Sequence, residues 1–395
     1  MEDKRKGFFS GFISGLLAGI LILAVICGGK YVLDRMNGDY TGGLVSEKDV
    51  NDKLDRINEL IGGMYLYEED IDREALIDGI YSGYTAALGD PYTTYFDKEE
   101  TEEFRDSIAG EFGGIGVTLS GRAGEEYVLS NVVEGSPAEQ SGIQDGDVLL
   151  QVDGHTVSGA DIETVVSWTS GEPGTEVVLR IRRGDEEMDL TLVRDIIEEQ
   201  TVESKMIEAD IGYIRIKEFD TVTYEQFKAA LADLENRGMG RLIIDLRGNP
   251  GGNLSTVTDM LELLLPEGMI VSTRDKYGNT EEFTCDGEHE FQKPLAVLVD
   301  GRSASAAEIF SAAVQDHGTG VIVGTQTYGK GVVQQTVDLG DGTSMKITIA
   351  EYYTPSGKSI NGTGVTPDVE VEYEYDEDDP ERDNQLEKAI EVVNG

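Results

Sequence analysis

The fold of this chain is decided by one stretch of sequence, which reads Pro294-Leu-Ala-Val-Leu-Val-Asp-Gly-Arg-Ser-Ala-Ser-Ala-Ala-Glu-Ile-Phe-Ser-Ala-Ala-Val314. Its first apolar run, residues 294–300, has the length of a buried strand, and residues 308–314 have the pattern of a helix. Ser305 therefore falls at a strand-to-helix turn, where its hydroxyl stands clear of the sheet. The first free N–H groups of the helix, notably that of Ala306, can face a developing oxyanion there.

A lysine lies in the second informative stretch, Thr327-Tyr-Gly-Lys-Gly-Val-Val-Gln334. A serine nucleophile needs a base, which is usually histidine. The histidines of this chain stand in no recognisable protease or metal-site pattern: His155, His289 and His317. Lysine can serve instead where burial lowers its pKa, and Lys330 is flanked by glycines and followed by two valines. In an extended chain, Lys330 and Gln334 share one face, so the Gln334 amide could orient the amine.

Ser305 also has a plain structural interpretation. Together with Glu308 it forms the S-x-x-E pattern of a helix capping box, and on the serine alone this interpretation is the better one. A cap has no need of Gly-Lys-Gly followed by a glutamine in strand phase, however. A third stretch, Asp245-Leu-Arg-Gly-Asn-Pro-Gly-Gly252, adds a glycine loop after the apolar strand 242–246. Together the three stretches favour a hydrolase whose nucleophile is served by a lysine.

These stretches resemble those of the C-terminal processing proteases, the tail-specific serine proteases of peptidase family S41. The resemblance runs from about residue 50 to the end of the chain, and its further matching stretches are Gly89-Asp-Pro-Tyr-Thr-Thr-Tyr-Phe96, Gly113-Gly-Ile-Gly-Val117, Gly135-Ser-Pro-Ala-Glu139 and Gly364-Val-Thr-Pro-Asp368. Two positions depart from the common pattern, namely Ala307, where serine is frequent, and Gly248, where asparagine is frequent. Neither departure removes a proposed catalytic group.

The resemblance implies a role for each candidate residue of the site. Ser305, not Ser303, is the implied nucleophile, Lys330 is the base, and Gln334 orients the lysine. An oxyanion hole similar to that of the family would combine the N–H of Ala306 with one from the Pro-Gly-Gly loop. The candidates for that second donor are Gly251 and Gly252. No metal and no cofactor is expected.

Residues 107–195 differ in character from the sequence on either side. Short apolar strands alternate there with turns rich in Gly, Pro and Asp, a pattern similar to that of a PDZ domain. Such domains add a ligand C-terminus as an extra strand and hold its carboxylate on backbone N–H groups. The loop predicted to do this is Gly113, Gly114, Ile115 and Gly116. A tight turn between strands is the simpler alternative for any one of its glycine pairs.

An N-terminal apolar segment determines the expected location. Between Lys6 and Lys30 lie 23 residues without a charge, enough to cross a bilayer as a helix. The cations of residues 4–6 precede the segment, which predicts a cytoplasmic N-terminus and an extracytoplasmic catalytic domain. A cleaved signal peptide is the alternative, but its apolar region would be shorter. We therefore predict a single-pass signal anchor in the cell membrane.

The predicted fold class is α/β. Its parts are a cytoplasmic N-terminus (1–6), a single transmembrane helix (7–29), a tether (30–45), a small helical region (46–106), an α+β PDZ domain (107–195), an α/β serine protease core (196–372), and an acidic linker with a C-terminal helix (373–395). The family resemblance implies that the core is ClpP/crotonase-like. The C-terminal helix could pack on its own core or on a second subunit, which leaves a homodimer open.

Charge and cysteine content exclude several functions. Lys plus Arg number 32 against 77 Asp plus Glu, for a formal net charge of −45. Such an acidic chain argues against binding nucleic acid or an anionic lipid surface. Cys285 is the only cysteine after the apolar segment, which excludes an intrachain disulfide there.

The predicted function is that of a membrane-anchored serine endopeptidase that cleaves protein substrates near their C-termini. Its partners would be protein or peptide C-termini, recognised by the PDZ domain. A membrane-tethered PDZ scaffold that binds tails without cutting them is the rival from another class. Such a scaffold would not need Ser305, Lys330 and Gln334 together. A Ser/His/Asp protease with a PDZ domain is a third possibility, disfavoured because no histidine stands in a suitable context.

Overall fold

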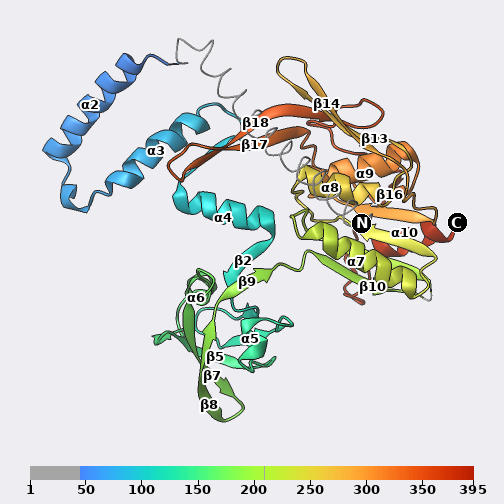
Figure 1. The fold of residues 1–395 in the computed structure, drawn as a ribbon, viewed down its shortest axis with the longest axis horizontal. Helices are drawn as coiled ribbons and strands as arrows, with labels where there is room; N and C mark the ends of the chain where they lie inside the picture. The colour runs from blue at the N-terminus through green and yellow to red at the C-terminus, as the bar shows by residue number, and fades with distance from the viewer. Residues whose placement is uncertain (1–44, 209) are drawn as a thin grey trace, which may run out of the picture. The chain divides into compact units, whose positions relative to one another are not determined.

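The computed structural model describes residues 45–208 and 210–395, which are coloured in Figure 1. The chain divides into two compact units, residues 1–77 and 78–395. In the first unit, α2 (Glu47–Met64) is followed by a short 3₁₀ helix, η1 (Glu68–Asp70). The next helix, α3 (Arg73–Ala86), crosses the boundary between the units.

The predicted fold class needs one correction. No helix among the described residues is long and apolar enough to cross a membrane. The longest of them, α2, has 18 residues but carries charged side chains in nearly every turn. The transmembrane helix predicted at residues 7–29 falls outside the described residues, and the location of the protein stays a prediction.

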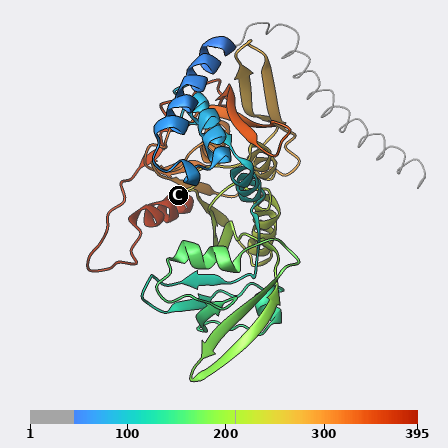
Figure 2. The same cartoon turned by 90° about the vertical axis from the view of Figure 1, so that its left-hand side faces the viewer.

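Residues 118–193, within the predicted PDZ domain, form a sheet with its own apolar core. Its strands follow the order β3-β4-β5-β7-β8, with β6 paired to β5. Their bounds are Thr118–Ser120, Tyr127–Ser130, Val148–Val152, Glu176–Arg183 and Glu186–Val193, with β6 at His155–Thr156. The β7–β8 hairpin is green in Figure 2. The helices α5 (Pro137–Gln140) and α6 (Ile162–Thr169) contribute Ala138 and Val165 to the core. Because β3 pairs only with β4, it is an edge of this sheet.

Two short strands join the PDZ sheet to the rest of the second unit. These are β2 (Glu111–Gly114) and β9 (Asp195–Glu198), which pair with each other in antiparallel fashion. Before β2 comes α4 (Lys98–Ala109), which begins at a capping box formed by Asp97 and Glu100 and ends at Gly110. Gly110 has a φ of 72°, the left-handed conformation that favours glycine at a helix end.

The predicted protease core is built on a sheet of six strands in the order β10-β11-β12-β15-β16-β19. Their bounds are Val202–Met206, Ile211–Ile216, Arg241–Asp245, Leu295–Val299, Val321–Gly324 and Val369–Glu370. The pairing is parallel from β11 onward, and only β10 runs antiparallel to its neighbour. The intervening helices α7 (Thr223–Asn236), α8 (Leu254–Glu262) and α9 (Ala306–His317) are those expected of βαβ units.

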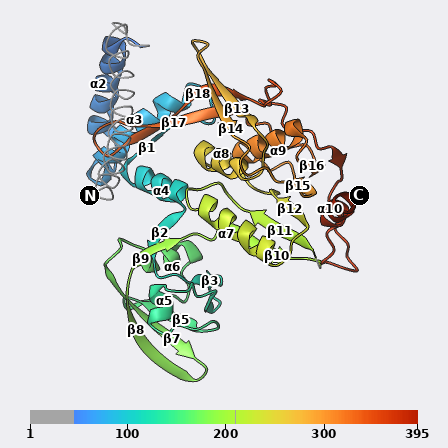
Figure 3. The ribbon, with the colours of Figure 1, turned by 45° about the vertical axis from the view of Figure 1, so that its right-hand side comes forward.

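Both faces of this sheet are covered by helices. Alternate residues of a strand point to opposite faces, so neighbouring residues of β12 pack in different cores. Leu242 and Ile244 of β12 pack in the core formed with α7, α8 and α9. Ile243, between them, packs with Ala389 and Val393 of α10 (Asn384–Asn394). Figure 3 shows α10 on the opposite side of the sheet from α7 and α8. The C-terminal helix therefore packs on its own core.

A second sheet lies next to the predicted site. It runs in the order β1-β18-β13-β14, with β17 paired to β18. The bounds are Thr94–Phe96, Ser344–Tyr353, Gly268–Asp275 and Thr280–Cys285, with β17 at Val332–Asp338. Lys330 lies two residues before β17, so this sheet carries the second half of the site.

Candidate active site

Ser305 sits in a strained turn between β15 and α9. All five residues of β15 are buried, and α9 begins at Ala306. Ser305 has a φ of 54°, a left-handed conformation that costs a non-glycine residue free energy and is frequent at functional sites. Ser303, in contrast, is fully buried, and its hydroxyl donates to the carbonyl of Leu246 at 2.8 Å. The geometry therefore separates an accessible serine from a structural one.

The Glu308 carboxylate ties the serine turn to the lysine strand. It is fully buried, and its Oε2 accepts hydrogen bonds from the backbone N–H of Ser305 at 2.9 Å and of Lys330 at 2.8 Å. Its Oε1 accepts from the Thr327 hydroxyl at 2.6 Å and from the N–H of Gly329 at 2.7 Å. The sequence pattern indicated only the first of these four bonds, as half of a capping box. The other three come from residues 19 to 22 positions away and have no sequence signal.

Lys330 is half-buried, with its ammonium Nζ 4.9 Å from the centre of the Tyr92 ring. Burial lowers the pKa of Lys330, and the positive charge of Lys346 lowers it further, against the opposing effects of Glu308 and Asp90. The Tyr352 hydroxyl contacts the carbonyl oxygens of both Ser305, at 3.2 Å, and Lys330. No hydrogen bond of the described residues joins the Ser305 hydroxyl to the Lys330 amine. The backbone of Lys330 is thus held close to the serine turn, and its ammonium packs against the ring of Tyr92.

Two backbone N–H groups next to Ser305 have no acceptor among the described residues, and they belong to Ala306 and Gly252. The N–H of Gly251 is occupied, because it donates to Oδ1 of the buried Asn249 at 2.8 Å. Gly251 packs so closely that a Cβ there would lie 2.7 Å from the Cβ of Ser305, and its φ of 112° also requires glycine. Of the two glycines named from the sequence, Gly252 has the free donor.

The predicted catalytic residues line one cavity of about 250 Å³. Ser305, Ala306, Lys330, Gln334 and Gly252 all border it, and its apolar wall consists of Phe104, Ile108, Leu254, Ile309, Val332 and Val333. Gly251 lies behind this lining. The expected bond from Gln334 to the lysine is not formed in this structure, because the Gln334 amide donates instead to the carbonyl of Val332 at 3.4 Å and to the Thr348 hydroxyl at 3.3 Å.

The structure divides the predicted carboxylate loop between the strand β2 and the segment that follows it. Gly113 and Gly114 are strand residues of β2, paired with Ile196 and Asp195, and a side chain on Gly113 would overlap the carbonyl of Gly171. The backbone N–H groups of residues 115–117 have no described acceptor, and this segment leads directly into the edge strand β3. Glycine pairs in the sequence cannot distinguish a strand that needs close backbone approach from a loop that binds an anion.

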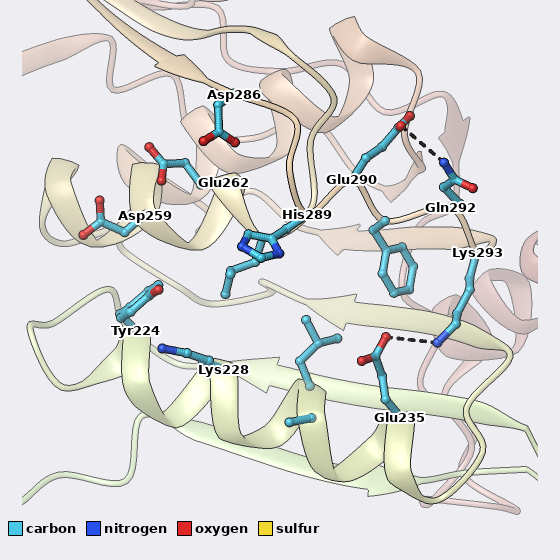
Figure 4. Close-up of a pocket in the computed structure, with 14 residues that line it drawn as sticks. Tyr224, Lys228, Glu235, Asp259, Glu262, Asp286, His289, Glu290, Gln292 and Lys293 are labelled. Carbon is cyan, nitrogen blue, oxygen red and sulfur yellow. Dashed lines mark hydrogen bonds and ion pairs between the residues drawn. The ribbon is translucent and has the colours of Figure 1, made fainter.

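A larger cavity of about 680 Å³ lies elsewhere, between α7, α8 and residues 286–293 (Figure 4). Figure 4 shows Asp259, Glu262 and Asp286 gathered on one side of it, and Lys293 pairs there with Glu235 at 3.1 Å. Burial and the two neighbouring aspartates raise the pKa of Glu262. None of the predicted site residues lines this cavity, and no cluster in the described part of the chain could hold a metal ion. Its size alone does not make it the reactive site.

An α/β core that brings a strained serine, a half-buried lysine and free N–H donors to one cavity is the arrangement of a serine-type peptidase, here with a PDZ domain. The family model of peptidase family S41 matches residues 210–371, and that of the PDZ domain matches residues 128–183. The chain therefore belongs to the carboxy-terminal processing proteases of peptidase family S41, as its relatives show. The alternative of a scaffold that does not cleave is set aside.

Two curated relatives establish this membership. The chain is 38% identical over 309 residues to the carboxy-terminal-processing protease of Bartonella bacilliformis, covering 76% of this chain and 70% of that protein. It is 36% identical over 323 residues to the carboxy-terminal processing protease CtpA of Bacillus subtilis, covering 81% and 69%. Among solved structures it is similar to the photosystem II D1 C-terminal processing protease, with 28% identity, 89% and 98% coverage, and a TM-score of 0.49.

Proposed function

We propose that this peptidase uses a Ser305–Lys330 dyad to cleave protein substrates near their C-termini. The observation that carries the proposal is the shared cavity, in which the accessible serine, the half-buried lysine and the free N–H groups of Ala306 and Gly252 meet. A hydrogen bond between nucleophile and base is often long in a free enzyme and shortens with substrate bound. We expect the Lys330 amine to leave the Tyr92 ring and reach the Ser305 hydroxyl in that complex.

The reaction then follows the acyl-transfer pattern. The neutral Lys330 amine accepts the proton of the Ser305 hydroxyl while the oxygen attacks the scissile carbonyl. The N–H groups of Ala306 and Gly252 stabilise the negative charge that develops on the carbonyl oxygen. The Lys330 ammonium then protonates the leaving amine, and a water molecule, deprotonated by the same lysine, releases the acyl group. We assign Gln334 an orienting role, reached when its amide turns from Thr348 toward Lys330.

The dyad predicts a defined pH dependence. Lys330 acts as a base only when neutral, and its pKa lies below the ordinary value of about 10.4 because of burial and the charge of Lys346. The neutral fraction grows as pH rises through that pKa, so kcat/KM should rise with pH on a single limb and then level off. Initial rates on one peptide from pH 5 to 10 measure it. Rates that fall steadily over this range would rule out a lysine base.

Substrate tails are proposed to bind the PDZ domain between β3 and α6. A peptide could extend the sheet at the open edge of β3 and place its terminal carboxylate on the N–H groups of residues 115–117. Gly116 has a φ of 76°, and a Cβ at this position would overlap the side chain of Ser136. This turn therefore requires glycine. The proposed contact is therefore one of backbone donors with an anion.

The inactive variant Ser305→Ala should capture substrates by their tails. Peptides with a free, apolar C-terminus should bind it at least about tenfold more tightly than the same peptides with an amidated C-terminus, because amidation removes the anion. Fluorescence anisotropy with labelled peptide pairs measures the ratio. A variant with Gly116→Val should lose the difference, whereas Thr191→Val, at an exposed position of strand β8 in the same domain, should keep it. Equal binding of acid and amide by the unsubstituted loop would show that tails are not recognised there.

A further inference from the structure

A second lysine borders the active cavity and has no role in the reaction described above. Lys346 of β18 is half-buried and lines the cavity together with Ser305 and Lys330. Its ammonium lies 5.3 Å from the ring centre of Phe96 and 4.9 Å from that of Phe104. Those two rings stack on each other, with centres 4.8 Å apart. Burial lowers the pKa of Lys346, and no described carboxylate acts on it.

The strand register places Lys346 on the face of the β17–β18 pair that carries Gln334. In the β17–β18 pair, Lys346 lies opposite Thr336, and Thr348 lies opposite Gln334. Side chains two residues apart share one face of a strand, so Lys346 and Thr348 are on the face that carries Gln334. This face borders the cavity that Lys330, two residues before β17, also lines.

One segment contributes an aromatic ring to each lysine. Tyr92 lies under the ammonium of Lys330, and Phe96 lies beside that of Lys346. Thr93, between them, accepts a hydrogen bond from the N–H of Thr348 at 3.1 Å and donates to Asp90 at 2.6 Å. The stretch Gly89–Phe96, which stands out in the sequence without a role of its own, thus packs against both lysines.

The aromatic rings that contact the Lys346 ammonium do not neutralise its charge. A carboxylate partner would neutralise its field, whereas aromatic faces attract an ammonium and leave the net charge in place. Lys330 has neighbouring groups that favour its protonated form and one that opposes it. The carboxylates of Glu308 and Asp90 and the ring of Tyr92 favour the protonated form, whereas the positive charge of Lys346 opposes it. The neutral Tyr352 hydroxyl contacts the carbonyl of Lys330.

We propose that Lys346 is a positioning residue of the reaction, whose ammonium, held on two aromatic rings at the same cavity, favours the neutral Lys330 amine that Ser305 needs. The segment Gly89–Phe96 holds the two lysines in this relation. A neighbouring cation is one of the two ways in which proteins make a lysine available as a base, and burial is the other. The proposal rests on the Ser305–Lys330 function proposed above, and it assigns the control of that base to a residue outside the dyad.

The test compares Lys346→Met, which keeps the length of the side chain without its charge, with Lys346→Arg, which keeps the charge. In Lys346→Met the rising limb of kcat/KM should move to higher pH, with activity on the acid side falling roughly two- to fivefold and the plateau little changed. Lys346→Arg should restore the wild-type limb. The matched control is Lys228→Met on α7, an exposed lysine outside the cavity, which should leave the limb unmoved.

A second measurement does not depend on turnover. Lysine side chains labelled with carbon-13 can be titrated by NMR in the Ser305→Ala protein, where Lys330 is assigned by its loss in Lys330→Arg. Its titration should move to higher pH when Lys346→Met is added. Asp220 also titrates near neutrality, since burial raises its pKa to about 7. The shift should therefore persist in an Asp220→Asn background.

Each outcome decides between distinct conclusions. An unmoved limb in Lys346→Met, with an unmoved Lys330 titration, would overturn the proposal while leaving the dyad intact. A loss of activity that is equal at every pH, and is not restored by Lys346→Arg, would show a packing role instead and would also overturn it. Failure of the dyad itself would appear separately, as turnover that survives Lys330→Ala.

Discussion

Ser305→Ala and Lys330→Ala should each lower kcat/KM by at least about 10³-fold, and the double variant should be no worse than either. The non-additivity follows from the mechanism, because a nucleophile without its base, or a base without its nucleophile, has lost the same step. Steady-state hydrolysis of a fluorogenic peptide measures the loss. Circular dichroism should show an intact fold, since neither side chain makes a described hydrogen bond that the core depends on.

Two neighbouring residues are the controls for that result. Ser303→Ala should keep turnover within about tenfold of the unsubstituted enzyme, because the Ser303 hydroxyl donates to the Leu246 carbonyl inside the protein. Loss of that hydrogen bond should lower the free energy of unfolding by about 1 kcal/mol. Gln334→Ala should lower the rate less than either dyad variant, because the amide orients the amine and carries no proton. Substantial hydrolysis by Ser305→Ala would refute the assignment of the nucleophile.

Glu308→Ala should be the most damaging single change outside the dyad. It would leave four donors without their acceptor, two of which are the backbone N–H groups of Ser305 and Lys330. Removing one partner of such a buried charged network costs about 3–5 kcal/mol in the free energy of unfolding. Turnover should fall at least about 100-fold as well, because the serine turn and the lysine strand lose their common anchor. Urea denaturation and peptide hydrolysis measure the two effects.

Glu308→Gln distinguishes the anchor from bulk stability. The glutamine fills the same space but places an NH₂ group against N–H donors. A Glu308→Gln protein that stays folded at low temperature should therefore remain poorly active. Glu225→Ala is the matched control, because Glu225 is an exposed acidic residue in the first turn of the neighbouring helix α7. Near-normal activity in a folded Glu308→Gln protein would show that the carboxylate does not align the site.

Much of the local structure around the site follows from short-range sequence patterns. The apolar run 294–300 becomes β15, and the alanine-rich run after Ser305 becomes α9, because strand and helix periodicity depend on neighbouring residues. Glycine stands at positions 251 and 252 for a local reason too, because the φ values of these residues disfavour every other residue type. The family of the protein could be recognised from these stretches, and the relatives confirm it.

Other features depend on contacts between segments far apart in the chain. The amphipathic helix at the C-terminus was compatible with its own core or with a second subunit, and only the packing of Ala389 and Val393 on the parallel sheet decided between them. Gly113 and Gly114 appeared suited to a binding loop, but pairing with β9 makes them strand residues. A one-dimensional pattern shows which backbone conformations a segment allows and not which partner its hydrogen bonds will find.

The set of reactive groups, together with the local turns and strands that present them, follows from residue type and from near neighbours in the chain. How these groups act on one another depends on contacts made in the folded protein. Glu308 joins two segments that lie 22 residues apart, and the rings of Tyr92 and Phe96 reach lysines more than 200 positions further along the chain. Charge, burial and hydrogen bonding act over a few ångströms in space, so the proton affinity of Lys330 is a property of the folded chain.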